Sequence, residues 1–507
     1  QFPVSVLQNG VKMTNEPPKG LRANMVGSYL SDPINDLSFF DGCGGDNPQA
    51  FKPLIFGMCF FHAVIQERRK FGPIGWNIPY EFNTSDLRIS VRQLKLFLET
   101  YSTVPLEALK YCTGEANYGG RVTDDKDRRC MAAILASPLS EGALSAGFLF
   151  APELNAEGKG IYVQPGGVQT HAEYLEFIKS LPSLQSPSCF GLHENASITK
   201  DLKETRELFD AIMLTQASSG GGGGGGGDEM LARIVEDIAS KLPGDYDLEA
   251  VQALFPVSYL ESMNTVLEQE LVRFNRLIAI VRTSLNSLKK AIKGLVVMDA
   301  DLEALASSLM LGTRPALWMK RSYPSLKPLG SYVSDLLRRL AFFQKWIDDV
   351  KAPPTFWLPG FFFTQAFLTG STQNSARRNS IAIDQLEFEY FVLDNQEQSE
   401  APEDGVYVYG VFLEGARYST ETKMLAECEP KVLFVSLPMM WLRPTKLEEL
   451  VERPHYKCPL YKTSERKGTL STTGHSTNFV MFLQLPSDRP ESHWVNRGVA
   501  GLTQLAD

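Results

Sequence analysis

Residues 113–129, TGEANYGGRVTDDKDRR, gather glycines, arginines and aspartates of the kinds that bind phosphate groups or metal ions. The spacing of Gly114 and Gly119 matches the start of a P-loop, whose backbone N–H groups surround a phosphate. A P-loop continues with Lys and Ser or Thr, which contact the β- and γ-phosphates and Mg²⁺. Here the residues after Gly119 are GRV, so the side chains that this chemistry requires are missing.

The aspartates of the same stretch do not match a calcium loop. Asp124, Asp125 and Asp127 lack the glycine and the final glutamate that an EF-hand loop needs at fixed offsets. Negative side chains suit the N-terminus of a helix, and Arg128 and Arg129 follow within reach of an ion pair. We therefore expect these aspartates to cap or pair at the next helix.

Two other groups of residues could carry chemistry, and neither is complete. Ser471 and His475 in STTGHSTNF could form a nucleophile–base pair, but no G-x-S-x-G elbow is present, and such polar residues suit a hairpin. His455 and Cys458 could bind a metal ion, but no second pair of ligands accompanies them. We expect no catalytic, cofactor-binding or metal site in this sequence.

The composition is that of an ordinary globular protein, with 43% hydrophobic and 21% charged residues among 507. A net charge of −9 argues against broad, sequence-independent nucleic-acid binding, which needs a basic surface. The cysteines are scattered, odd in number and without a C-x-x-C pair, which favours reduced thiols in a cytosolic compartment. They are Cys43, Cys59, Cys112, Cys130, Cys189, Cys428 and Cys458.

No stretch is expected to span a membrane. The most apolar segment, 356–368, is too short and contains Pro359 and Gly360, whereas a spanning helix needs about 20 apolar residues. The sequence begins at Gln1 without a charged-then-apolar signal. We expect a piece of a longer protein that contacts neither membrane nor nucleic acid.

Helical periodicity dominates the first part of the sequence. The segment 52–71 has an apolar first half and a charged second half, and 83–101 opens with the cap candidates NTS. Shorter helices are expected at 106–114 and 127–135. The residues predicted to share one face of the helix at 83–101 are Leu87, Val91, Leu94, Leu98 and Tyr101.

An unbroken glycine run, Gly220–Gly227, predicts a flexible loop or linker. After it, apolar residues at steps of three and four run from 260 to 297, where about 38 helical residues would span roughly 57 Å. Gly294 is a weak point near the end, and a second stripe runs over 333–350. A coiled-coil seam is possible, but core packing is favoured because the steps do not hold a strict heptad.

From about residue 380 the apolar residues alternate, as Leu386 and Phe388 do. The runs VYVYGVFL, KVLFVSL and TNFVMFLQL are also rich in strand-forming residues. Ile381 and Ile383 fall out of phase with this pattern, so a bulge or break is expected near Asp384. The predicted fold class is α+β, with helical regions followed by a small antiparallel sandwich or barrel.

Several long blocks of this sequence resemble the dynein heavy chains. KPLIFGMCFFHAVIQERRKFGPIGWNIPYEFNTSDLRIS and TGEANYGGRVTDDKDRR are similar to the lid of the sixth AAA+ module. ESMNTVLEQELVRFNRLI and FFFTQAFLTG resemble the helical half of the C-terminal domain, and YGVFLEGARY resembles its β-barrel half. GVFLEGAR and TLSTTGHSTNF are similar to axonemal rather than cytoplasmic dyneins, and MMWLRPTK and HWVNRGVAGL are most similar to the single-headed inner-arm type.

The resemblance implies a division of the sequence into five regions. The expected regions are the end of the sixth AAA+ large subdomain (1–35), the helical lid (36–140), a connecting segment with the poly-Gly loop 220–227 (141–228), the helical half of the C-terminal domain (229–365) and its β-barrel half (366–507).

The resemblance also implies a function, that of an ATP-driven, minus-end-directed microtubule motor of cilia and flagella. This segment would close and brace the AAA+ ring without hydrolysing nucleotide, while ATP and Mg²⁺ would bind in upstream modules. The expected partners are the first and fifth AAA+ modules of the same heavy chain, microtubules through the upstream stalk, dynein light and intermediate chains, and axonemal complexes. The expected location is the axoneme, part of the cytoskeleton of a cilium or flagellum, after synthesis in the cytoplasm.

On this resemblance, TGEANYGGRVTDDKDRR is a structural corner of the lid. Gly119 and Gly120 would permit a tight turn with positive φ. Arg88 occupies roughly the place where AAA+ lids put a sensor arginine, and we expect an inter-domain salt bridge there. The candidates for an inter-domain interface are Arg88, Asn117, Tyr118, Gly119, Gly120, Arg121, Asp124 and Asp125.

Two other interpretations remain open at this point. A stand-alone scaffold with a ligand- or peptide-binding β-domain would gain support if exposed aromatics such as Trp441 and Trp494 shared one groove. A hydrolase that uses Ser471 and His475 would need an Asp or Glu within hydrogen-bond reach of that histidine, and an oxyanion site.

Overall fold

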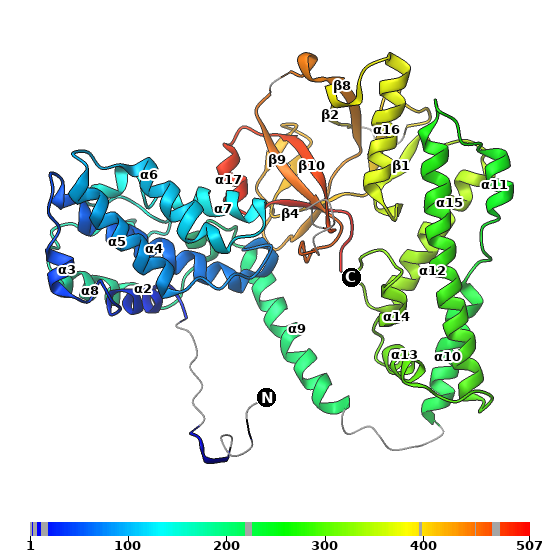
Figure 1. The fold of residues 1–507 in the computed structure, drawn as a ribbon, viewed down its shortest axis with the longest axis horizontal. Helices are drawn as coiled ribbons and strands as arrows, with labels where there is room; N and C mark the ends of the chain where they lie inside the picture. Colours follow the sequence, from blue (N-terminus) through cyan, green and yellow to red (C-terminus); the bar gives the residue numbers. More distant parts are fainter. Residues whose placement is uncertain are drawn as a thin grey trace. The chain divides into compact units, whose positions relative to one another are not determined.

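A computed structural model describes residues 3, 8–11, 19–217, 226–394, 398–451, 453–468 and 477–506. The protein divides into two compact units, Gln1–Ser197 and Ile198–Asp507 (Figure 1). Ser471, His475 and most of the glycine run lie outside the described residues. Gly226 and Gly227 already begin a helix, which corrects the expectation that the whole run stands outside secondary structure.

Unit 1 is a helical bundle built around one apolar helix, α4, which packs against α2, α5 and α7. Nearly every side chain of α4 is buried, because its neighbours surround it. The helices of this unit are α2 (Leu21–Tyr29), α3 (Leu37–Asp41), α4 (Phe51–Glu67), α5 (Thr84–Thr100), α6 (Leu106–Tyr111), α7 (Asp125–Leu135) and α8 (His171–Ser180).

The segment after α7 also belongs to the core of unit 1. Its backbone folds back on itself, with an isolated β-bridge between Leu149 and Val163. The ring of Phe150 packs against the rings of Phe56 and Phe60 on α4, at centroid distances of 5.7 and 5.3 Å. The first part of the predicted connecting segment therefore packs into the core of unit 1.

The predicted helix at 83–101 is confirmed as α5, which Asn83 and Asp86 begin with a capping box. Its apolar face is buried as predicted at Leu87, Val91, Leu94 and Leu98. Tyr101 is wrong as a member of that face, because it lies beyond the helix end and is 51% exposed.

The helical stretch Pro48–Ile74 is long and apolar enough, by length and composition alone, to cross a membrane. This stretch is not the one that the sequence singled out, which was 356–368. In the structure 78% of its apolar window is buried, so its side chains form the core of unit 1.

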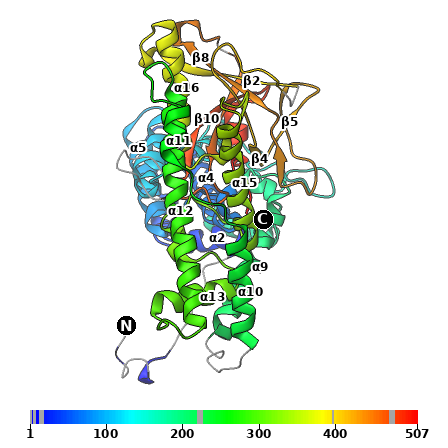
Figure 2. The ribbon, with the colours of Figure 1, turned by 90° about the vertical axis from the view of Figure 1, so that its right-hand side faces the viewer.

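Unit 2 is organised around α12, which packs against α10, α11, α13, α15 and α16 (Figure 2). Its apolar stripe is buried from Met263 to Leu288, as the periodicity predicts. The remaining described helices are α9 (Ala196–Ala217), α10 (Gly226–Lys241), α11 (Leu248–Leu254), α12 (Ser262–Ile292), α13 (Ala300–Met310), α14 (Ala316–Met319), α15 (Leu329–Asp348), α16 (Thr364–Asn379) and α17 (Glu491–Asn496).

Both long helices end earlier than predicted. α12 has 31 residues, which corresponds to roughly 46 Å, because Gly294 adopts a positive φ of 71° and stops it. Leu295 is 72% exposed and so lies outside the buried stripe. α15 ends at Asp348, and Val350 is 55% exposed at a φ of 48°.

The strands form open, mixed sheets. The orders are β1-β3-β8-β2, β10-β9-β11-β4-β7 and β5-β6, with β1 parallel to β3 and β11 parallel to β9. The strands are β1 (Thr355–Trp357), β2 (Leu386–Val392), β3 (Val406–Tyr409), β4 (Phe412–Glu414), β5 (Arg417–Ser419), β6 (Met424–Ala426), β7 (Phe434–Ser436), β8 (Met440–Lys446), β9 (His455–Tyr461), β10 (Phe479–Pro486) and β11 (Ala500–Leu502).

The fold is therefore α+β, as predicted, but its sheets are not purely antiparallel. Among the described strands no sheet closes on itself, so the expected barrel is not seen. The predicted break near Asp384 is confirmed as a short 3₁₀ turn, Ile383–Gln385, immediately before β2.

Buried charged groups hold the segment between β1 and α16 in place. Glu270 on α12 is fully buried, and its carboxylate accepts the backbone N–H groups of Phe362 and Phe363, the latter at 2.9 Å. Arg339 on α15 donates to Asp335 at 2.7 Å and to the carbonyl of Pro359. α12 and α15 are thus joined to the turn between β1 and α16 through charge-assisted hydrogen bonds.

We predict that Glu270→Ala destabilises unit 2 by roughly 3–5 kcal/mol, because it leaves two backbone N–H groups without an acceptor and removes the counter-charge of Arg273. Hydrogen exchange at the Phe362 and Phe363 amides measures this loss. Gln269→Ala, at an exposed neighbour on the same helix, is the matched control and should change stability by less than about 0.5 kcal/mol. Equal protection of both amides in the two variants would contradict the assigned role of Glu270.

Candidate functional site

The backbone of the corner at 113–129 is a succession of tight helical turns. α6 passes into a π-helical turn, Cys112–Asn117, and then into a 3₁₀ turn, Gly119–Arg121, before α7 begins. A Cβ on Gly119 would lie 2.3 Å from the carbonyl oxygen of Gly114, so the close approach of two turns requires glycine there. The predicted positive φ at Gly119 and Gly120 is wrong: neither glycine has one, and Gly120 faces open space.

Tyr118 anchors the corner in the core of unit 1. Its side chain is fully buried, its ring packs edge-on against Phe61 at 5.2 Å, and its hydroxyl lies 3.0 Å from His62 Nδ1. Burial raises the pKa of the Tyr118 hydroxyl and lowers the pKa of His62 to about 4. Both groups are therefore neutral at physiological pH, which suits structural pairing.

Two more candidates fasten the corner to α5. Asn117 donates its amide hydrogens to Ser90 Oγ at 2.9 Å and to Gln93 Oε1 at 2.7 Å. Arg121 Nε lies 3.0 and 2.9 Å from the two carboxylate oxygens of Asp86, which also caps α5. These contacts lie inside unit 1, so the side chains of Asn117 and Arg121 are occupied there.

The three aspartates have different roles, and the spacing predicts the role of Asp124 but not that of Asp127. Asp124 caps α7 by accepting the N–H groups of Lys126 and Asp127 at 2.8 and 3.2 Å, as predicted, and Asp125 stands exposed in the first turn. Asp127 instead turns inward and accepts the N–H groups of Asn77 and Ile78 at 2.9 and 3.1 Å.

The basic residues of the corner also differ from expectation. Arg128 pairs with Glu115 at 3.3 Å and donates to the carbonyl of Val122, rather than to the aspartates. Arg88 is exposed, and it forms no hydrogen bond or ion pair within the part of the protein that the structure describes. Of the predicted interface residues, Arg88 is thus the one cation that the described part of unit 1 leaves available.

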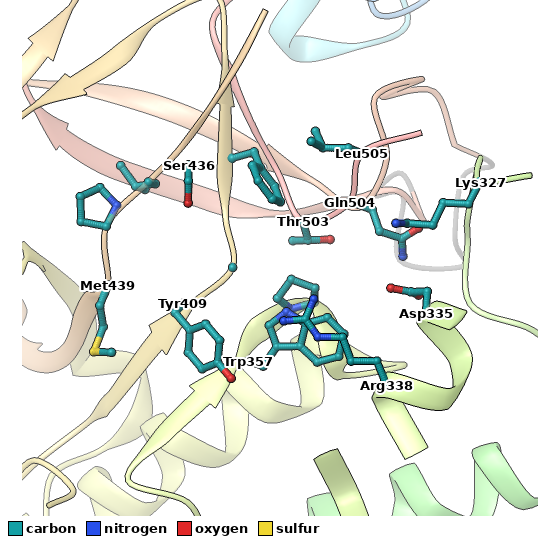
Figure 3. Close-up of a pocket in the computed structure, with 15 residues that line it drawn as sticks. Lys327, Asp335, Arg338, Trp357, Tyr409, Ser436, Met439, Thr503, Gln504 and Leu505 are labelled. Carbon is teal, nitrogen blue, oxygen red and sulfur yellow. The ribbon is translucent and has the colours of Figure 1, made fainter. Parts of the chain in front are cut away.

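A second candidate site, not predicted from the sequence, is a cavity of about 440 Å³ in unit 2 (Figure 3). α15 contributes Asp335 and Arg338, β1 contributes Trp357, and the end of β3 contributes Tyr409. The periodicity of α15 held a signal, because Arg339 stands at core spacing between Leu336 and Phe343. An arginine at such a position indicates a buried polar network.

The remaining candidates predicted from the sequence do not come together. Trp494 is buried and donates to Ser487 Oγ at 2.7 Å, while Trp441 donates to the carbonyl of Asp404 at 2.8 Å, so the two tryptophans do not form an exposed aromatic groove. His455 and Cys458 are three residues apart on β9, and the thiol is buried. None of the seven cysteines forms a disulfide bond, in agreement with the prediction of reduced thiols.

We predict a pH dependence of lid stability from Asp127. Burial, followed by the charge of Asp124, raises the Asp127 pKa to about 7, against about 3.9 in an unfolded polypeptide. The folded state then binds more protons between these values, so its stability falls as pH rises from about 4 to about 7, by up to roughly 4 kcal/mol.

Unfolding of wild type and Asp127→Asn at pH 5 and pH 8 tests this. The variant should lose the fall in stability, whereas Asp125→Asn, at an exposed neighbour, should keep it. Comparison with the wild type is needed because the lowered pKa of His62 acts in the opposite direction below pH 6.5. An unchanged slope in Asp127→Asn would show that this carboxyl is ionised throughout.

Comparison with known proteins places the two units in one family. Residues 51–196 match the family model of the dynein heavy chain AAA lid domain, and residues 202–503 match that of the C-terminal domain of the dynein heavy chain. The protein is 55% identical over 507 residues to dynein axonemal heavy chain 12 of Mus musculus, and 53% identical to dynein axonemal heavy chain 3 of Homo sapiens.

Each alignment covers all of this protein's residues but only 16% and 12% of these relatives, respectively. Dynein axonemal heavy chain 1 of Mus musculus is 47% identical, again over all 507 residues and 12% of the relative. The matches place the lid model on unit 1 and the C-terminal model on unit 2. This protein therefore belongs to the axonemal dynein heavy chains and contains their AAA lid and C-terminal domains.

Proposed function

We propose that this protein is a non-hydrolysing segment that closes and braces the AAA+ ring of an ATP-driven, minus-end-directed microtubule motor. ATP and Mg²⁺ would act in other modules of the parent heavy chain. The proposed setting is the axoneme of a cilium or flagellum, in a single-headed inner arm. The partners would be the first and fifth AAA+ modules, microtubules reached through the stalk, and dynein light and intermediate chains.

The observation that carries this proposal is the apolar face of α9. Helical spacing places five side chains of this helix on one side, since each lies three, four or seven residues from at least one other of the set. All five are exposed, from 41% to 61% of their surface: Leu202, Leu208, Phe209, Ile212 and Met213. A contiguous apolar face of this kind marks a surface that packs against more protein.

The length of the relatives supports the heavy chain itself as that further protein. The 507 residues amount to 16% or less of each relative compared above, so most of the parent polypeptide lies outside them. A bracing segment should expose the surfaces with which it contacts neighbouring modules. The lid adds Arg88, whose guanidinium has no partner among the described residues and suits an inter-domain salt bridge.

The size of the native polypeptide tests the basic proposal. An antibody against residues 229–350 should detect a band of several hundred kilodaltons in a denaturing gel of source extract, enriched in isolated cilia. A band near 56 kDa, the mass of these 507 residues alone, would reject the proposal and reopen the scaffold interpretation.

We predict that Arg88→Glu in the complete heavy chain slows microtubule-stimulated ATP hydrolysis by up to roughly fivefold, because a half-exposed salt bridge contributes about 1 kcal/mol or less. Nucleotide binding at the first module should persist. Lys159→Glu, which reverses the charge of an exposed lysine in the same unit, serves as the control. Equal slowing in both variants would show that Arg88 does not take part in the proposed interface.

Arg121→Ala should loosen ring packing less than Arg88→Glu, because Arg121 is held by Asp86 inside the lid. We expect nucleotide binding at the first module to survive this change as well. Accessibility of the lid to limited proteolysis in the complete heavy chain measures packing. Lost nucleotide binding with unchanged packing would contradict a structural role for the corner.

A further inference from the structure

We propose that the cavity in unit 2 binds an acidic peptide segment of a partner protein, with one carboxylate held by Arg338. The cavity lies where α15, the turn after β1 and the ends of several strands meet (Figure 3). Its volume of about 440 Å³ lies in the range of ligand sites. The proposed ring-bracing role does not depend on this site.

Arg338 is the anchor of the proposed site. Its guanidinium stacks on the ring of Trp357 at 4.1 Å, which fixes its plane at the cavity wall. Arg338 is exposed and makes no hydrogen bond or ion pair with any residue that the structure describes. A planar guanidinium with its N–H groups free matches the two oxygens of a carboxylate.

Two further hydrogen-bond donors border the same cavity. The indole N–H of Trp357 and the hydroxyl of Tyr409 have no hydrogen-bond partner among the described residues. Figure 3 shows the rings of Trp357 and Tyr409 on the same side of the cavity as Arg338. Unpaired donors gathered at one place require a ligand that is rich in acceptors.

The acid in the wall does not cancel this positive charge. Asp335 lies against Arg339, with its carboxylate 2.7 Å from Nε of that arginine, and both side chains are buried. Arg338 therefore leaves a positive charge for a ligand, although the protein as a whole carries −9.

The other walls favour a peptide over a free anion. Apolar groups complete the lining, namely Phe412, Leu437, Met439 and Leu505. An extended segment with an acidic residue beside an apolar one therefore satisfies both the charge and the apolar floor.

The complete heavy chain and the labelled peptide fluorescein-Glu-Leu-Glu-Leu-amide provide the test by fluorescence anisotropy. We expect saturable binding that weakens as salt rises. Arg338→Ala should weaken binding roughly 10- to 100-fold, and Tyr409→Phe, which removes only a hydroxyl, by about fivefold. Arg321→Ala removes an exposed arginine outside the cavity and should leave binding unchanged.

Several results would overturn the proposal. One is equal binding of the matched peptide fluorescein-Gln-Leu-Gln-Leu-amide, and another is equal loss in Arg338→Ala and Arg321→Ala. If tripolyphosphate binds at Arg338 while the glutamate peptide does not, the ligand is a phosphate. A photo-crosslinking residue at Ser436, in the cavity wall, should capture a partner polypeptide in axonemes. If only the heavy chain itself is captured, the occupant of the cavity is a segment of the same polypeptide and the proposed partner protein is rejected.

Discussion

The turn between β1 and α16 in unit 2 is held by a carboxylate buried on the central helix of that unit. Burial raises the pKa of Glu270, while two backbone N–H groups and the nearby Arg273 and Arg339 favour its charged form. Such a charge is tolerated only when its acceptor sites are filled, because an unpaired buried carboxylate costs several kcal/mol. The turn at 358–363 must therefore keep the conformation that presents its N–H groups to α12. This constraint also fixes Trp357, and with it one wall of the cavity.

In the lid, too, polar side chains are paired within the protein, and these pairings leave no phosphate site. A glycine-rich stretch followed by aspartates resembles a phosphate site in sequence, but its polar side chains find partners within the lid. Asn117 and Arg121 pair with α5, and Asp124 caps α7. The glycine at 119 is needed because the carbonyl of Gly114 leaves no room for a Cβ, and its backbone does not form a phosphate cradle. Arg88 stands apart because it has no partner of this kind among the described residues.

The sequence predicts most helices because their apolar spacing and caps are local properties. α5, α7 and α12 lie where periodicity and capping residues place them, within a few residues. The end of α12 fits the weak point expected at Gly294, whereas the exposure of Leu295 and Val350 was missed, because exposed apolar side chains do not alter the pattern of residue types. Strand partners were also unpredictable, since β1 pairs with β3 across about fifty residues and β11 inserts between β9 and β4. The cavity depends on these pairings, so no local motif indicates it.

The contrast between the corner and the cavity is informative about function. In both places polar side chains line a tight fold, but in the corner the amide of Asn117 and the guanidinium of Arg121 have acceptors on α5. In the cavity Arg338, Trp357 and Tyr409 hold donors that no described residue accepts, and the nearest acid is committed to Arg339. Water can occupy such donors, but water does not require an arginine held over an indole ring. A preorganised guanidinium lowers the entropy cost of binding a planar anion, which gives this geometry its value for recognition.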